Sequence, residues 1–380
     1  MNRPRPSVLV VGHGPPTRGG IPSFLTGLVE DEWLADRTVI EYFNTCPVST
    51  KQPGAFTLSN LRLTFEHAVG VLRRSRRVDV VHLNLAPVGM LPLLRAMLIS
   101  ACAKLSGTAV ILHAHAGGLA ETASRSVLYR ALMKLSKVVI DRIVVVSRDS
   151  ESALSCLRGG VSFIANGIDL TALTLEDREV GEPTLVFAGT VCERKGLLDL
   201  RDALLRLREN GSLSVPLKVK IAGDDAQESG GFERIRSAYE AAGLQDVVFL
   251  GALSPPDMVL LLRRASLFCL PSHREGLPLS LLEAMGAGCG IVASEVGDVP
   301  FVLDHGECGI LFAPHDVGAL AAAIERLAND IHLRHNLGQR AQARVQQEFN
   351  RRSMLRKLYE LYVEAAGFSS LVDRQEFDVA

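Results

Sequence analysis

Short hydrophobic runs alternate along the chain with longer segments in which apolar residues recur every three or four positions. The runs have the length and the valine and isoleucine content of strands buried on both faces, and the longer segments have the spacing of amphipathic helices. The strand-like runs of the first half are residues 8–11, 78–83, 109–113 and 143–146. Those of the second half are residues 184–188, 217–222, 247–250, 267–270 and 290–293. Because strands and helices alternate, the pattern predicts parallel sheets covered by helices, an α/β fold.

The alternation restarts past residue 180, which predicts two sheets and therefore two domains. A chain of 380 residues is long enough for each domain to bury its own core. We expect an N-terminal domain over residues 1–170, a linker over 171–183, a C-terminal domain over 184–350, and a C-terminal helix and tail over 351–380. Two facing, doubly wound domains of Rossmann-like type would place a ligand in the interdomain cleft, at the carboxyl ends of both sheets.

Composition and charge narrow the class of protein. Apolar residues make up 47% of the chain and charged residues 22%, as in globular proteins, and a net charge of −1 gives no basis for nucleic-acid binding. Seven cysteines without a C-x-x-C pair predict reduced thiols in a cytoplasmic protein. The N-terminus has the pattern of a first strand and not of a signal peptide, and the most apolar stretch, 87–103, is too short to cross a bilayer.

A glycine-rich turn, GHGPPTRGG, follows the first predicted strand over residues 12–20. Glycines such as Gly19 and Gly20 let the backbone approach a ligand and open a helix whose first amides can hold an anion. The turn does not match the G-x-G-x-x-G fingerprint of nicotinamide dinucleotide sites, because Thr17 stands at the third glycine. A tight turn without a ligand is the alternative.

The most informative segment is PSHREGLPLSLLEAMGAG, over residues 271–288. A predicted strand precedes it, and a proline stands in the first turn of the helix that follows. The amides of Leu279 and Ser280 are then predicted to point at an anion such as a diphosphate. Glu275 and Glu283 bracket that position and can accept hydrogen bonds from sugar hydroxyls. Two solvated glutamates on an ordinary strand–helix unit are the alternative.

Two further motifs follow predicted strands. In the segment 187–196, the adjacent cations Arg194 and Lys195 beside a glycine turn suit the neutralisation of a departing diphosphate, with exposed surface cations as the alternative. His113 and His115 end a strand of the first domain and point to the same side. No third ligand is spaced near them, so we predict no metal site. A histidine that lines the cleft and a structural histidine both remain open.

An arginine cluster at residues 73–77 and a hydrophobic helix around 90–105 lie in the more basic half of the chain. They predict peripheral contact with an anionic membrane that carries a lipid-linked acceptor. A solvated arginine face and a core helix explain the same residues equally well.

Together these motifs resemble the large retaining glycosyltransferase family usually called family 4, or glycosyl transferases group 1, of the GT-B architecture. The matching positions, which span roughly residues 12–320, are Gly19-Gly20, His115-Ala-Gly-Gly, Asn166-Gly-Ile-Asp, Gly189, Arg194-Lys195-Gly196, Gly223 and the 271–288 segment. The resemblance implies transfer of a sugar from a nucleotide-diphosphate sugar to an acceptor hydroxyl, in polysaccharide or glycolipid biosynthesis, with retention of anomeric configuration. It implies no cofactor, and the chain contains no D-x-D, consistent with a metal-independent, hexosyltransferase-type reaction.

The resemblance also implies roles for individual residues. Glu275 would contact the transferred sugar, Glu283 the ribose and Lys195 the diphosphate. His115 would lie beside the reaction centre. The remaining donor contacts implied are Gly19, Gly20, Gly189, Thr190, Gly223, Leu279 and Ser280. On the acceptor side they are His113 and Asn166.

One position departs from the family pattern: Thr190 stands where the family usually has an arginine. Either Arg194 supplies the missing cation or the site uses Lys195 alone. Two other functions share the architecture, namely a sugar-nucleotide 2-epimerase and a binding protein without catalytic activity.

Overall fold

The protein is described by a computed structural model that covers residues 5–17, 20–46, 58–115, 118–155, 157, 160–173, 182–225 and 230–368. The chain divides into two compact units, one comprising Met1–Asn166 with Arg352–Ala380, the other Gly167–Arg351. Each unit contains a six-stranded sheet, and every strand pairing described in either sheet is parallel. The predicted fold class, two Rossmann-like α/β domains, is confirmed. Gly19 and most of the predicted 171–183 linker lie outside the described residues.

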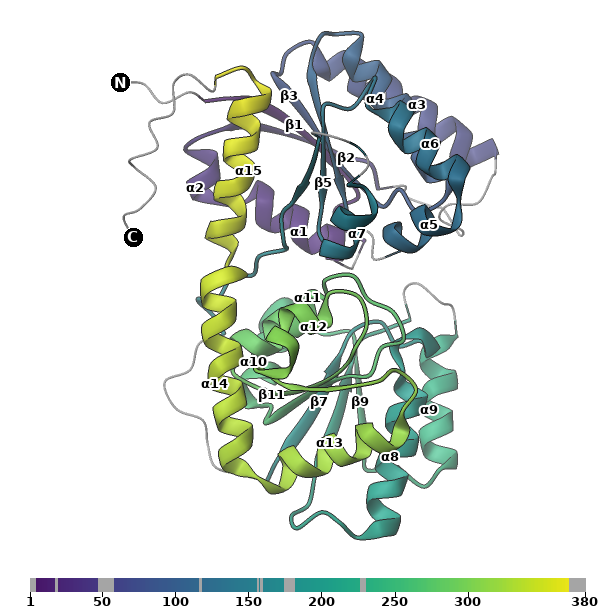
Figure 1. The fold of residues 1–380 in the computed structure, drawn as a ribbon, viewed down its shortest axis with the longest axis vertical. Coiled ribbons are helices and arrows are strands. Elements are labelled where there is room, and N and C mark those ends of the chain that lie inside the picture. Colours follow the sequence, from purple (N-terminus) through teal and green to yellow (C-terminus); the bar gives the residue numbers. More distant parts are fainter. Residues whose placement is uncertain are drawn as a thin grey trace. The chain divides into compact units, whose positions relative to one another are not determined.

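The sheet of the first unit has the order β2-β1-β3-β4-β5-β6 (Figure 1). Its strands are β1 (Ser7–Gly12), β2 (Val39–Asn44), β3 (Val80–Leu85), β4 (Ala109–Ala114), β5 (Arg142–Val145) and β6 (Val161–Phe163). Its helices are α1 (Gly20–Val29), α2 (Glu32–Ala35), α3 (Leu58–Ser75), α4 (Met90–Lys104), α5 (Leu119–Arg125), α6 (Val127–Ser136), α7 (Arg148–Ala153) and α15 (Arg351–Ala365). The central strands are buried on both faces, which explains their uninterrupted apolar sequence.

Helices cover both faces of this first sheet. On one face α3, α4 and α6 pack against Leu9, Val81 and Leu112. On the other face α1 and α15 pack against Val8 and Val10. Helix α15 therefore completes the core of the first unit, although the sequence did not predict where it docks.

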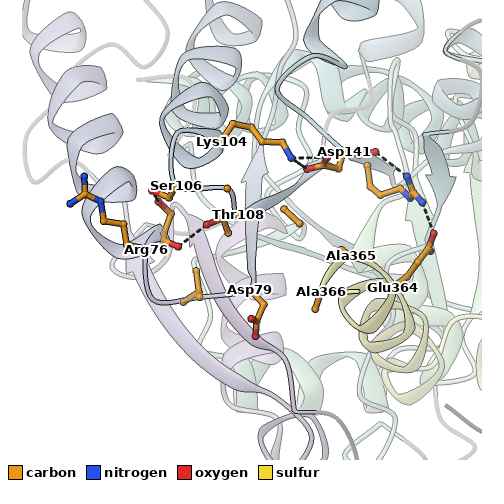
Figure 2. A pocket seen from close by; sticks show the side chains of 14 residues that line it. Arg76, Asp79, Lys104, Ser106, Thr108, Asp141, Glu364, Ala365 and Ala366 are labelled. Atoms are coloured by element: carbon orange, nitrogen blue, oxygen red, sulfur yellow. Dashed lines mark hydrogen bonds and ion pairs between the residues drawn. The ribbon is translucent and has the colours of Figure 1, made fainter. Parts of the chain in front are cut away.

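A cavity of about 560 Å³ opens at the amino ends of these strands (Figure 2). The ion pair of Lys104 with Asp141 lines it, as does that of Arg142 with Glu364. The cavity contains none of the site residues predicted from the sequence.

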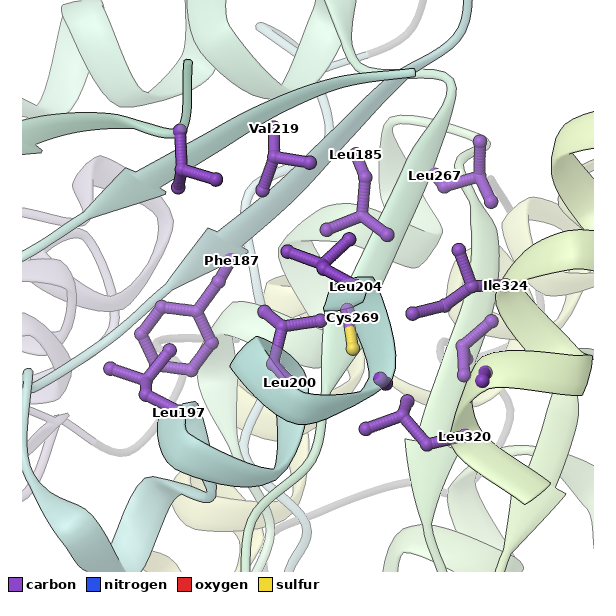
Figure 3. Close-up of a cluster of buried hydrophobic side chains, with 14 of the residues drawn as sticks. Leu185, Phe187, Leu197, Leu200, Leu204, Val219, Leu267, Cys269, Leu320 and Ile324 are labelled. Carbon is purple, nitrogen blue, oxygen red and sulfur yellow. The ribbon is translucent and has the colours of Figure 1, made fainter. Parts of the chain in front are cut away.

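The sheet of the second unit has the order β12-β11-β10-β7-β8-β9. Its strands are β7 (Thr184–Ala188), β8 (Lys218–Ala222), β9 (Val248–Gly251), β10 (Leu267–Leu270), β11 (Gly290–Ser294) and β12 (Ile310–Phe312). Its helices are η1 (Glu193–Lys195), α8 (Leu197–Asn210), α9 (Gly231–Ala241), α10 (Pro255–Arg264), α11 (Leu279–Gly286), α12 (Val299–Val302), η2 (Asp304–Gly306), α13 (Val317–Asn329) and α14 (Ile331–Glu348). Apolar side chains of α8 and α13, such as Leu200 and Leu320, pack on the sheet beside Phe187 and Leu267 (Figure 3).

This strand order places a topological switch point in the second unit. From β7 the chain proceeds to β8 and β9 on one side, and then returns to β10, β11 and β12 on the other. The loops after β7 and β10 therefore start at neighbouring strands, and from them the chain continues to opposite sides of the sheet. Ligands of open α/β sheets bind at such points.

The two segments that enter and leave the second unit run beside each other. Ile168 forms a parallel bridge with Asn350, with Ile168 N donating to Phe349 O at 3.0 Å and Arg351 N donating to Ile168 O at 2.8 Å. A Cβ on Gly167 would lie 2.7 Å from the Asn350 carbonyl oxygen, so this contact requires glycine. The chain thus enters and leaves the unit at one place.

Among the described helices, none is both long and apolar enough to cross a membrane.

Candidate functional site

Two loops meet at the switch point because Gly196 lets their backbones touch. Gly196 follows η1 with φ +68°, and a Cβ on it would lie 1.8 Å from the Pro271 carbonyl oxygen. The contact is reinforced by His273 N, which donates to Arg194 O at 2.9 Å, and by Arg194 Nη1, which donates to the Arg274 carbonyl at 3.0 Å. The loop after β7 and the loop after β10 are therefore held as one structure.

Lys195 and Glu275 form an ion pair between these two loops. The Lys195 Nζ atom lies 2.6 Å from Glu275 Oε1, and the side chains are only 12% and 8% exposed. The hydroxyl of Ser272 donates to the same carboxylate oxygen at 2.6 Å. Arg194, by contrast, places its guanidinium on a backbone carbonyl. Lys195 is therefore the cation held at low exposure beside the switch point, and Arg194 has a loop-binding role in this arrangement.

The start of α11 presents unused amides. Pro278 precedes the helix, and its carbonyl accepts from Leu281 N at 3.2 Å and Leu282 N at 3.4 Å. Leu279 N and Ser280 N donate no hydrogen bond within the described residues. Such amides at a helix start attract an anion, because the helix dipole is positive there.

Glu283 lies further along the same helix and has no side-chain hydrogen bond or ion pair among the described residues. Burial raises the pKa of its carboxyl group from 4.5 to about 7. A half-buried carboxyl group without a protein partner is incompletely solvated, which costs free energy. The Glu283 carboxyl group is therefore free to accept a hydrogen bond from a ligand hydroxyl.

The third loop of the switch point follows β8 and depends on Gly223. Gly223 has φ +138°, and a Cβ there would lie 1.8 Å from the Gly189 carbonyl oxygen. Gly189 and Thr190 therefore pass directly against the loop after β8, with Val191 N donating to Asp224 O at 2.8 Å. Thr190 brings no charge to this turn.

The structure thus gathers nine of the predicted residues in the second unit. They are Gly189, Thr190, Arg194, Lys195, Gly223, Glu275, Leu279, Ser280 and Glu283. In the first unit lie Gly20, which begins α1, together with His113, His115 and Asn166. Asn166 is buried, at 8% exposure.

The two predicted histidines of the first unit belong to a longer polar chain. Tyr362 Oη lies 2.7 Å from His82 Nδ1, and His82 Nε2 lies 3.2 Å from His113 Nδ1. The His113 ring stacks on that of His115 with centroids 4.0 Å apart, and His115 Nε2 lies 2.9 Å from Asn84 Oδ1. His82 and Asn84 belong to β3, His113 belongs to β4, and His115 directly follows β4. Tyr362 comes from α15.

Burial keeps these imidazoles neutral. It lowers the pKa of His82 and of His115 to about 3, and that of His113 well below its usual value. Neutral imidazoles exchange hydrogen bonds with hydroxyls but supply no positive charge. The sequence reasoning missed His82, Asn84 and Tyr362. The H-x-N at the end of one predicted strand, matching the H-x-H at the end of the next, is the signal that points to the first two.

Three side chains of the second unit are of the types that hold a metal ion. They are Asp199 of α8, His273 and His315. The Asp199 Oδ2 atom lies 2.8 Å from His273 Nε2 and 3.7 Å from His315 Nδ1. The potential ligand atoms lie within 4.8 Å of one another. Sequence reasoning considered only His113 and His115 as ligands, because these three residues come from three separate segments. In the geometry described here, the His273–Asp199 contact also ties the loop after β10 to α8.

Comparison with known proteins connects the second unit to one family. Residues 176–344 match the model of the family described as glycosyl transferases group 1. The chain is 30% identical to a glycogen synthase of Mycobacterium tuberculosis over 207 residues, which cover 54% of this chain and 49% of that protein. It is 29% identical to an MMP alpha-(1->4)-mannosyltransferase of Mycolicibacterium hassiacum over 201 residues, 52% of this chain and 47% of that one. The chain thus spans about half the length of the curated relatives it matches.

Solved structures resemble nearly the whole chain. A sucrose-phosphate synthase from Thermosynechococcus elongatus superposes with a TM-score of 0.76 at 22% identity, covering 95% of this chain and 99% of that one. Anabaena HepE in complex with UDP-glucose superposes with a TM-score of 0.71 at 17% identity, covering 95% and 100%. These likenesses confirm the GT-B fold class predicted from the sequence.

Proposed function

We propose that the protein is a glycosyltransferase that moves a sugar from a nucleotide-diphosphate sugar to an acceptor hydroxyl, with retention of anomeric configuration and without a cofactor. The observation that carries the proposal is the Lys195–Glu275 pair, which lies in the segment that matches glycosyl transferases group 1. The pair lies at the switch point, between the loop after β7 and the loop that precedes α11 and its unused amides. A cation and free amides there can stabilise a diphosphate as it leaves.

The donor contacts follow from the chemistry of the second unit. The amides of Leu279 and Ser280 suit the diphosphate oxygens, and Lys195 adds a positive charge. The unpartnered carboxylate of Glu283 suits the two hydroxyls of a ribose. Nothing in these contacts selects the base or the sugar. Binding of UDP-glucose in a structural relative supports a nucleotide sugar as donor.

The proposed reaction breaks the bond between the anomeric carbon and the diphosphate oxygen. Negative charge grows on that oxygen and is stabilised by Lys195 and the helix amides. The acceptor oxygen forms its bond to the anomeric carbon from the same face, and its proton passes to the departing phosphate oxygen. Glu275 contacts the transferred sugar. Lys195 must exchange its carboxylate partner for the diphosphate, so the ion pair described above represents the state without donor.

Donor binding and turnover test the proposal. A panel of nucleoside diphosphates and their sugars should raise the melting temperature of the protein, because a ligand of the native state stabilises it. With the donor so identified, Glu283→Gln should weaken nucleotide binding, and Glu275→Gln should lower kcat more than it changes KM. Lys218→Met serves as the control, because Lys218 is exposed and pairs with Glu182 at the far end of β8. The proposal fails if no nucleotide binds, or if all three variants transfer sugar equally well.

A 2-epimerase receives no support from the glycogen synthase, the mannosyltransferase and the sucrose-phosphate synthase that this chain resembles. The two reactions separate cleanly, because an epimerase acts on the donor alone. Incubation without acceptor should return the nucleotide sugar unchanged or hydrolysed. Appearance of its C2 epimer would replace our proposal with the alternative.

We also propose that the first unit contacts an anionic membrane through α3, α4 and α6. Large apolar side chains on these helices are 44% to 86% exposed, namely Leu58, Leu61, Phe65, Leu91, Leu94, Leu98, Val127, Leu128 and Leu135. Those of α3 and α4 follow the same i, i+3, i+7 spacing, so each helix carries one outward apolar stripe. The three helices contact one another through α4. Apart from Arg95, which bonds to His67, and Lys104, which pairs with Asp141, they carry five Lys and Arg against one Glu.

Apolar side chains among basic ones are what an anionic leaflet binds. Vesicles of phosphatidylcholine with phosphatidylglycerol should therefore sediment the protein at low salt, and those of phosphatidylcholine alone should sediment less. Leu94→Glu should release the protein. Leu260→Glu provides the matched control, because Leu260 of α10 has the same 45% exposure in the other unit. Equal binding by both variants, or self-association that hides Leu94, would contradict a membrane-binding face.

A further inference from the structure

Arg95 of α4 is a largely enclosed cation without a carboxylate partner. Its Nη2 donates to His67 Nδ1 of α3 at 2.9 Å, and His67 is 9% exposed. Its Nε is buried without any hydrogen-bond partner. No aspartate or glutamate among the residues that the structure describes forms an ion pair with Arg95. The guanidinium therefore holds donor groups that nothing in the described chain uses.

His13 belongs to the same cluster. It follows Gly12, the last residue of β1, and its Nε2 is also buried without a partner. Burial and then the charge of Arg95 lower the pKa of His13, and the same causes lower that of His67 to about 4. Glu66 is the acidic group that acts on His67, but its carboxylate pairs with Arg62 at 2.8 Å. The cluster is thus a set of hydrogen-bond donors around one uncompensated positive charge.

The location of the cluster matters as much as its charge. His13 lies at the carboxyl end of β1, and Arg95 and His67 come from the two helices that flank β3 in sequence. In an open α/β sheet this is the edge at which ligands bind. The cavity at the amino ends of the strands is lined by different residues, and two of its cations, Lys104 and Arg142, are paired with acids.

Enclosing an unpaired guanidinium costs free energy, so chains that retain one usually offset that cost with an anion. Guanidinium groups bind phosphate and carboxylate through parallel N–H donors. We infer that Arg95, His67 and His13 bind an anionic group, a phosphoryl or a carboxylate, carried by the acceptor. That this ligand is the acceptor rests on the proposed glycosyl transfer, whereas the presence of an anion site does not.

The inference is tested by binding of inorganic phosphate to the full chain, measured by calorimetry. A Lys195→Met background removes the cation of the proposed donor site, so that the remaining phosphate binding reports the first unit. Arg95→Met should raise the dissociation constant about 10- to 100-fold, the effect of losing one charge-assisted hydrogen bond. Arg95→Lys should retain part of the affinity. Arg125→Met, which removes an exposed arginine of α5 that pairs with Glu121, should leave it unchanged.

Stability gives a second readout that separates a ligand site from a structural role. Without phosphate, Arg95→Met should unfold at a urea concentration equal to or higher than the unsubstituted protein, because an uncompensated charge is removed. A structural arginine would do the opposite. Loss of stability in Arg95→Met, together with phosphate binding that matches Arg125→Met, overturns the inference.

Competition identifies the source of the anion. Vesicles of phosphatidylcholine with phosphatidic acid should displace phosphate from the protein, and should bind Arg95→Met more weakly than the unsubstituted protein, if the acceptor is a lipid phosphate. Displacement by a soluble sugar phosphate alone assigns a soluble acceptor. Phosphate binding through Arg95 in a protein that binds no nucleotide would leave this site standing while the proposed function fails. Sugar transfer that is unaffected by Arg95→Met, with no phosphate binding, would do the reverse.

Discussion

The Lys195 ammonium group lies 2.6 Å from the Glu275 carboxylate, and neither side chain is more than 12% exposed. The pair connects two loops that are nearly 80 residues apart in the chain and that leave neighbouring strands. Its charges cancel each other until a ligand enters. A diphosphate that takes the ammonium would leave the carboxylate to a sugar hydroxyl, so binding and activation of the donor become one event.

Removing one partner of this pair should be more costly than removing both. Lys195→Met or Glu275→Gln leaves an unpaired buried charge and should lower the free energy of unfolding by about 3–5 kcal/mol. The double variant Lys195→Met/Glu275→Leu should regain most of that loss while remaining inactive. Urea denaturation measures all three. Lys218→Met breaks an exposed pair and should cost less than about 1 kcal/mol. Single variants no worse than this control would show that the Lys195–Glu275 pair is not desolvated.

The Glu283 carboxyl group should make the protein less stable as pH rises. Its pKa is about 7 in the folded protein, against 4.5 for an ordinary glutamate, so the folded state holds a proton that the unfolded state has lost between these values. Stability from this group is present at low pH and lost as pH rises through 7. Glu283→Gln should therefore match the unsubstituted protein near pH 4 and exceed its free energy of unfolding near pH 8.

Denaturation at several pH values checks this sign. The exposed Glu295→Gln should leave the pH profile unchanged. A constant difference between Glu283→Gln and the unsubstituted protein across the pH range would mean that the carboxyl group is not desolvated. The gain in stability should be accompanied by weaker nucleotide binding, since the neutral amide replaces a carboxylate acceptor.

Substitution of two glycines with positive φ, Gly211 and Gly223, should distinguish the cost of backbone strain from the cost of a steric clash. Gly211→Ala has open space around the new Cβ and should cost only about 1–2 kcal/mol of conformational strain. Gly223→Ala places its Cβ against the Gly189 carbonyl oxygen and must move the turn that carries Thr190. It should therefore weaken binding of a nucleoside diphosphate as well as lower stability. Calorimetric titration of the two variants would refute this if both bind the nucleotide equally.

Tyr362 should act on the reaction through His82 and His113. Tyr362→Phe removes one buried hydrogen bond and should cost about 1 kcal/mol of unfolding free energy. Tyr129→Phe loses a comparable bond, to the Pro87 carbonyl, and is the control. Only Tyr362→Phe should lower kcat for transfer to the acceptor, with KM for the donor unchanged. Identical kinetics of the two variants would reduce the histidine chain to a structural role.

Metal removal tests the role of Asp199, His273 and His315. The charge that stabilises the leaving group is assigned to Lys195 and the α11 amides, so EDTA should leave donor turnover unchanged. Turnover that falls with EDTA and returns with Zn²⁺, in the unsubstituted protein but not in His315→Ala, would assign a required metal to this cluster and contradict a metal-independent reaction.

Much of the fold was predictable because central parallel strands are continuous apolar runs. The predicted run 267–270 coincides with β10, and 184–188 with β7. The strands that were missed, β2, β6 and β12, are at the outer positions of their sheets. The sequence of β2 is interrupted by Glu41 and has exposed positions, and β6 and β12 are only three residues long, so none of them presents a long buried apolar run. Periodicity alone finds the centre of such a sheet more readily than its edges.

The site was predictable to the extent that its residues are close in sequence to strand ends. Glu275, Lys195 and the α11 amides each follow a predicted strand, so their meeting at one edge could be anticipated. Tyr362 is 280 residues from His82, and no spacing predicts that contact. Arg95 and His67 were not identified, because each looks like an ordinary helix residue until the absence of an acid partner is seen in three dimensions.

The return of α15 to the first unit affects how the protein is made. Residues 167–351 form an insertion within the first unit, since the chain enters and leaves at the Ile168–Asn350 bridge. During synthesis the inserted unit can acquire its whole core before Leu355, Leu358 and Tyr362 emerge from the ribosome to cover the first sheet. A nascent chain therefore leaves the apolar surface that α15 covers exposed to chaperones until Tyr362 has emerged, and a stop codon before α15 would damage the unit translated first.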